Sequence, residues 1–80
     1  MTNTIREITL INTRNGSNKI YAITIQLSNS KMYSVTGHYG KRSARSLNLA
    51  DKGLYSNLKE AYIKFDNVLH EKFRKGYLEE

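Results

Sequence analysis

Cysteine, proline and tryptophan are all absent from the 80 residues of the chain. Without cysteine no disulfide framework and no thiolate metal site can form, which excludes the disulfide-rich secreted mini-proteins and favours a reducing compartment. The apolar runs are too short to cross a bilayer, and the first residues, MTNTIRE, lack the apolar stretch of a signal peptide. We therefore expect a cytoplasmic protein that makes no use of a membrane.

The familiar signatures of catalysis are missing as well. The sequence contains no G-x-S-x-G elbow, no HExxH motif and no glycine-rich phosphate loop. His70 has no cysteine at the spacing of a metal site. We therefore expect a protein that is not an enzyme and that binds neither a cofactor nor a metal ion.

Positive charge is what the chain has in excess. Thirteen lysines and arginines against seven acidic residues give a net charge of +6. Residues 31–52 hold five basic residues and one acidic residue, a net charge of +4, whereas residues 53–80 are balanced. A concentrated cationic segment is typical of proteins that bind phosphate groups, although short basic loops also serve solubility alone. The five basic residues are Lys31, Lys41, Arg42, Arg45 and Lys52.

Alternating apolar and polar residues predict β-strands in the first two thirds of the chain. The alternation is clearest over Lys19–Leu27, and residues Ile5–Ile11, Met32–Tyr39 and, more weakly, Arg45–Leu49 show it too. Asn15-Gly16, between the first two segments, tolerates the positive φ of a turn. We therefore expect four strands, of which the second and third form a hairpin.

After Leu58 the apolar residues recur every three or four positions, which predicts an amphipathic helix ending near Phe73. Asn57 is the expected N-cap, Glu60 could return a bond to its backbone, and Gly76 is the expected left-handed stop. Lys72 falls within the apolar stripe, with its stem along the core and its ammonium in water. The whole chain is therefore expected to form one α+β domain, an antiparallel β-sheet of about four strands with one C-terminal α-helix packed on it.

Three segments in this order resemble the WGR domain. They are NKIYAITIQL, KMYSVTGHYGKR and the helix from Asn57 to Phe73, which is followed by KGY at Lys75 to Tyr77. The resemblance extends from about Asn12 to Tyr77. The WGR family is named for a Trp-Gly-Arg triplet and occurs in DNA-dependent poly(ADP-ribose) polymerases and in small stand-alone bacterial proteins. The matching triplet here is Tyr39-Gly40-Lys41, close to the Tyr-Gly-Arg-Arg of the bacterial proteins.

The resemblance implies a sheet with one packed helix and a surface that contacts DNA near a strand break. By position, Tyr39 would stack on a sugar and Lys41 would make the polar contact. Tyrosine stacks with less area than tryptophan, and lysine lacks the planar fork of arginine. These departures imply a shift from end-specific contact toward plain phosphate binding.

The residues around Tyr39 point to the same kind of ligand. Cations interleaved with a stacking ring suit a nucleic acid, because the cations neutralise phosphates while the ring meets a sugar or base. We expect a nucleic-acid-binding module, with DNA as the expected ligand, that uses Tyr39, Lys41, Arg42 and Arg45, with Lys31 and Lys52 in support.

Two alternatives stay open. Tyr39 shares its strand face with Tyr33 and Val35, so it could belong to the core while the cations are solvated turn residues. A protein-interaction domain that docks onto an acidic partner or a separate enzyme is the second candidate function. The edges of such a sheet also allow weak self-association besides a monomer.

Overall fold

The computed structural model describes residues 3–16, 18–28 and 30–80. Met1 and Thr2 lie outside these ranges. They belong to the N-terminal segment in which we expect no signal peptide. In chain order the elements are β1 (Asn3–Asn12), a short 3₁₀ turn η1 (Arg14–Gly16), β2 (Lys19–Leu27), β3 (Tyr33–Lys41), β4 (Asn48–Tyr55), α1 (Leu58–Arg74) and β5 (Leu78–Glu79). Within the described ranges no helix has the length and apolar character that a bilayer crossing requires.

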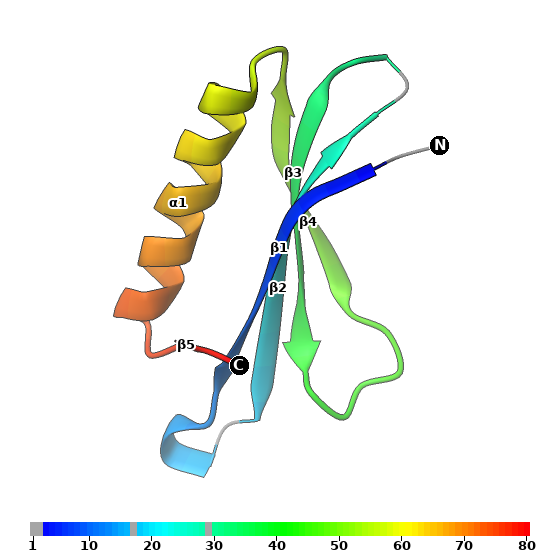
Figure 1. Ribbon diagram of the computed structural model, residues 1–80. Helices are drawn as coiled ribbons and strands as arrows, with labels where there is room; N and C mark the ends of the chain where they lie inside the picture. The colour runs from blue at the N-terminus through cyan, green and yellow to red at the C-terminus, as the bar shows by residue number, and fades with distance from the viewer. Residues whose placement is uncertain (1–2, 17, 29) are drawn as a thin grey trace.

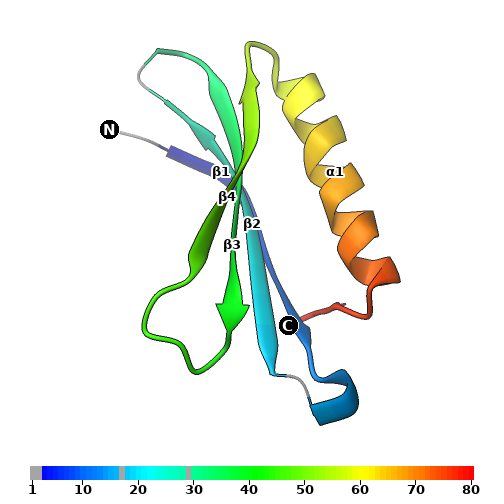
Figure 2. The ribbon, with the colours of Figure 1, turned by 180° about the vertical axis from the view of Figure 1, so that it is seen from behind.

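The strands form one antiparallel sheet in the order β4-β3-β2-β1-β5. Helix α1 lies along one side of this sheet in both Figure 1 and Figure 2, which confirms the expected α+β architecture. The β2–β3 turn lies at one end of the sheet, and the β3–β4 loop and η1 both lie at the other end (Figure 1). A nine-residue strand such as β3 spans about 27 Å, so residues at the two ends are far apart.

The core lies between α1 and the sheet face that the helix covers. Alternation along β2 and β3 places one apolar set on this face, and the stripe of α1 packs onto it. The buried apolar residues are Leu10, Tyr21, Ile23, Ile25, Val35, Ala61, Phe65 and Val68. The core thus fixes the distance between α1 and strands β2 and β3, where the candidate site lies.

The sequence signals at both ends of α1 are largely confirmed. The Asn57 side chain accepts a hydrogen bond of 2.7 Å from the Lys59 backbone N–H, as an N-cap does, but no bond returns from Glu60 in the described part of the chain. After the helix, Gly76 has φ +102° and its N–H donates to the Phe73 carbonyl, while the Tyr77 N–H donates to the Lys72 carbonyl. This is a Schellman motif, which turns the chain back so that Tyr77 meets the sheet.

The expected number of strands is wrong, because the sheet has five and not four. The added strand, β5, pairs with β1. It has only two residues and is too short to show any periodicity in the sequence. The fourth strand also lies later than Arg45–Leu49. A register shift interrupts β4, where Gly53 has φ +114° and donates its N–H to the Asp51 carboxylate at 2.9 Å. The irregularity breaks the alternation that would have marked the strand.

Candidate functional site

The site is built on Tyr21, whose ring lies over a glycine of the neighbouring strand. Tyr21 is 3% exposed, and a Cβ at position 37 would lie 2.6 Å from its Cζ atom and closer still to its hydroxyl oxygen. Gly37 therefore makes the room that the ring needs. The hydroxyl is buried, and no group in the described part of the chain hydrogen-bonds to it. Such an unpaired donor is costly in a folded protein and calls for an explanation.

Tyr39 stacks on this buried ring. The two ring centroids are 6.0 Å apart with an interplanar angle of 17°, an offset stacked arrangement. Tyr77, brought back by the Schellman motif, meets Tyr21 edge-on at 6.3 Å and 72°. Tyr39 itself is 39% exposed and is therefore not a buried core residue. Packing holds one part of the Tyr39 ring while the rest is open to a ligand.

Two lysines face each other next to Tyr39. Lys19 of β2 and Lys41 of β3 are direct partners in the antiparallel register, one pair beyond Tyr21 and Tyr39 on the same face. With Asn48 and Tyr77 they line a hollow of about 250 Å³, which we call the outer hollow. Its lining residues are Lys19, Tyr39, Gly40, Lys41, Asn48 and Tyr77. It contains two cations and no carboxylate.

A second hollow lies on the other side of Tyr39, between the sheet and the end of α1. This inner hollow has a volume of about 320 Å³ and is lined by Tyr21, Tyr39, Ala50, Lys52, Glu71, Lys72 and Lys75. The Lys72 ammonium lies 4.5 Å from the centroid of the Tyr21 ring, as a cation–π contact. The Glu71 carboxylate pairs with Lys75 at 3.3 Å. Three cations against one carboxylate leave this hollow with a net charge of +2.

The pKa shifts follow from this crowding. Burial lowers the pKa of Lys72, and the positive charges of Lys75 and Lys52 lower it further against the opposing effect of Glu71. The hydrogen bond from Lys75 lowers the pKa of the Glu71 carboxyl. Burial raises the pKa of Tyr21, with the Glu71 charge adding to it. An anion in the inner hollow would favour the charged form of Lys72 and so oppose the first of these effects.

The structure brings three of the expected site residues together and leaves the others apart. Tyr39, Lys41 and Lys52 line the two hollows. Arg42 forms an ion pair of 2.7 Å with Glu80, with both side chains about half exposed, a contact worth at most about 1 kcal/mol. Arg45 is exposed in the β3–β4 loop, and Lys31 is exposed in the β2–β3 turn at the far end of the sheet.

Most residues that line the two hollows were not predicted from the sequence, among them Tyr21, Lys19, Lys72, Lys75 and Tyr77. A signal existed for Lys19, because the hairpin between Leu27 and Tyr33 fixes a register that puts it opposite Lys41. Lys72 stood out as a cation within an apolar stripe, and its ammonium lies over the Tyr21 ring. Placing Lys75 and Tyr77 requires the geometry of the helix end, which periodicity alone does not give.

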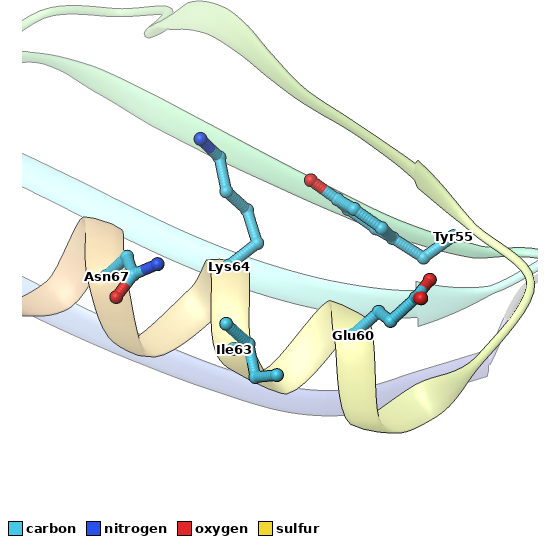
Figure 3. Close-up of a pocket in the computed structure, with 5 residues that line it drawn as sticks. All are labelled: Tyr55, Glu60, Ile63, Lys64 and Asn67. Atoms are coloured by element: carbon cyan, nitrogen blue, oxygen red, sulfur yellow. The ribbon is translucent and has the colours of Figure 1, made fainter.

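A third hollow, of about 420 Å³, lies between the first half of α1 and the end of β4 (Figure 3). Tyr55, Glu60, Ile63, Lys64 and Asn67 line it. Figure 3 shows the Lys64 ammonium and the Tyr55 hydroxyl on the strand side of the helix, while the Tyr55 hydroxyl donates to the Lys52 carbonyl at 2.9 Å. Its one cation and one carboxylate cancel, so it lacks the charge of the other two hollows.

The WGR domain family matches residues 6–80, nearly the whole chain. Neither a curated protein nor a solved structure matches the chain significantly. WGR domains are associated with nucleic-acid binding and are binding-type rather than catalytic domains. Since the match covers far more than half of its length, the chain belongs to the WGR domain family.

Proposed function

We propose that the chain is a non-catalytic module that binds nucleic acid, with DNA as the expected ligand. Tyr39 stacks on a sugar or base, and the lysines of the hollows contact the phosphate backbone or a strand end. Of the residues expected from the sequence, this proposal rests on Tyr39, Lys41 and Lys52. Arg42, Arg45 and Lys31 stay predictions, because they lie apart from the hollows.

The facing pair of Lys19 and Lys41 carries the proposal. Like charges directly opposite in an antiparallel pair destabilise the sheet, and the outer hollow supplies no carboxylate to offset them. A phosphate between the two ammonium groups would remove this repulsion. Because Tyr39 lies one pair inward on the same face, its ring is placed for the sugar or base that such a phosphate carries.

Fluorescence anisotropy with labelled single-stranded and duplex oligonucleotides at a series of salt concentrations tests this function. If three to five phosphates are neutralised, the logarithm of the association constant should fall with the logarithm of salt with a slope of about −2.7 to −4.5 for the duplex and about −2.1 to −3.5 for the single strand. Polyglutamate serves as a control, since a surface that attracts any polyanion would bind it equally well. Absence of binding at micromolar protein in low salt would refute the function.

Docking onto an acidic protein partner or a separate enzyme is the second candidate. Leu49 and Leu54 are largely exposed on β4, an edge strand of the sheet, and such leucines are typical of protein contacts. An acidic partner would use the same lysines without needing the Tyr39 ring. Equal binding of polyglutamate and DNA in the anisotropy experiment would therefore favour this candidate.

A further inference from the structure

Tyr39 lines both the outer and the inner hollow, and each of these hollows is lined by lysines. Lys41, which lines the outer hollow, follows Tyr39 by two residues along β3. Gly37 precedes Tyr39 by two residues, and its partner on β4, Ala50, lines the inner hollow. Two strand residues correspond to about 7 Å. A chain of phosphates that runs along β3 would therefore meet positive charge both before and after the ring.

The inner hollow has unmet capacity to bind an anion. Within the described residues, neither Lys52 nor Lys72 forms an ion pair, because the nearby Glu71 carboxylate bonds to Lys75. Burial and neighbouring cations lower the pKa of Lys72, as expected for an ammonium short of negative partners. A group with several acceptor oxygens, such as a phosphate, could contact more than one of these cations at once.

Tyr21 supplies a second observation that is independent of charge. Its ring lines the inner hollow, and its hydroxyl is an almost fully buried donor to which no described group hydrogen-bonds. Buried polar groups are nearly always paired in native proteins. A phosphate oxygen in the inner hollow within reach of this hydroxyl would give it an acceptor.

We propose that the inner hollow is a second phosphate subsite, so that Tyr39 stacks on an interior nucleotide of a single strand held by phosphates on both sides. This inference rests on the proposed function and makes it more specific. A terminal nucleotide would need cations on one side of the ring alone. An unpaired strand also leaves its bases free to stack, whereas a duplex presents a free base face only at its end.

The test uses a closed circle of single-stranded thymidines, which has no ends, beside a blunt duplex. The variant Lys52→Gln/Lys72→Gln removes two cations from the inner hollow. The control Lys59→Gln/Lys64→Gln removes two lysines of α1 that line neither the inner nor the outer hollow. We expect the native protein to bind the circle, and the inner-hollow variant to bind it on the order of 10-fold more weakly, with a salt slope less steep by about 1.4. The affinity of the control variant for the circle should be at most about twofold lower than that of the native protein, because this variant also loses two positive charges.

The outcomes separate the inference from the function on which it rests. If the inner-hollow variant binds the circle as the native protein does, or no worse than the control variant, the second subsite is refuted while the binding function stands. If the native protein binds the blunt duplex and not the circle, the interior-nucleotide reading is refuted. If it binds neither, the proposed function fails. Should thermal melting show the double variant to be unstable, Lys52→Gln alone carries the comparison, since Lys52 does not cover Tyr21.

Discussion

Replacement of Tyr39 by alanine is expected to weaken nucleic-acid binding by about 5- to 150-fold. Stacking of a base on an aromatic side chain contributes about 1–3 kcal/mol, and every 1.4 kcal/mol is a factor of ten in affinity. Tyr39→Phe keeps the ring and its packing on Tyr21, and should retain most of the affinity. Anisotropy titrations of the three proteins with one oligonucleotide measure the effect.

A matched control is needed because Tyr39→Ala also removes packing. Tyr62 of α1 is half-buried and packs edge-on against Phe65 at 6.5 Å, and it lines none of the three hollows. Tyr62→Ala should lower the thermal midpoint without a comparable loss of binding. If Tyr39→Ala binds as tightly as the native protein, or if Tyr62→Ala loses as much affinity, Tyr39 is not the stacking residue.

Gly37→Ala is expected to lower the free energy of unfolding by about 2–3 kcal/mol, the upper range for overpacking a core. For a domain of this size that corresponds to a fall of about 10–20 °C in Tm. The added Cβ would lie 2.6 Å from Tyr21 Cζ, and the ring cannot easily yield because Tyr39, Tyr77 and the Lys72 ammonium pack against it. Alanine for glycine in a strand is otherwise neutral or stabilising, so the sign of the effect is specific to this contact. Thermal denaturation followed by circular dichroism provides the measurement.

A double-mutant cycle shows whether the Tyr21 ring is the cause. In a Tyr21→Leu background the ring is gone, and adding Gly37→Ala should cost much less than in the native protein. Equal costs in the two backgrounds would mean that Gly37 does not serve to accommodate Tyr21. Because Tyr39 stacks on Tyr21, a displaced ring should also reduce binding beyond what the loss of stability explains.

The fold could be predicted from the sequence where local periodicity decides it. The alternation over Lys19–Leu27 defines β2 with its observed bounds, and the stripe from Leu58 defines α1. The fourth strand was misplaced because the irregularity around Gly53 interrupts its alternation. The fifth strand depends on the chain reversal after α1, so its two residues carry no signal of their own.

The site residues that lie close together in the sequence could be predicted, whereas the residues that tertiary packing brings to the site could not. Tyr39 and Lys41 lie in one motif, and the structure places both at the outer hollow. The ion pair between Arg42 and Glu80 could not be predicted from the sequence, because only the fifth strand brings these two residues together. Lys72 reaches the site from α1 through its contact with Tyr21, a tertiary contact that no spacing rule predicts.

An amide-shift titration of the isotope-labelled protein with a short DNA strand and a short duplex tests the central claim most directly. The account predicts saturable shifts at the backbone amides around both hollows, in β2 near Lys19, β3 near Tyr39, β4 near Lys52 and the end of α1. The first turn of α1, around Lys59, should stay unchanged. Shifts centred on that turn, or the absence of shifts at saturating DNA, would contradict the claim that Tyr39 and its flanking lysines bind nucleic acid.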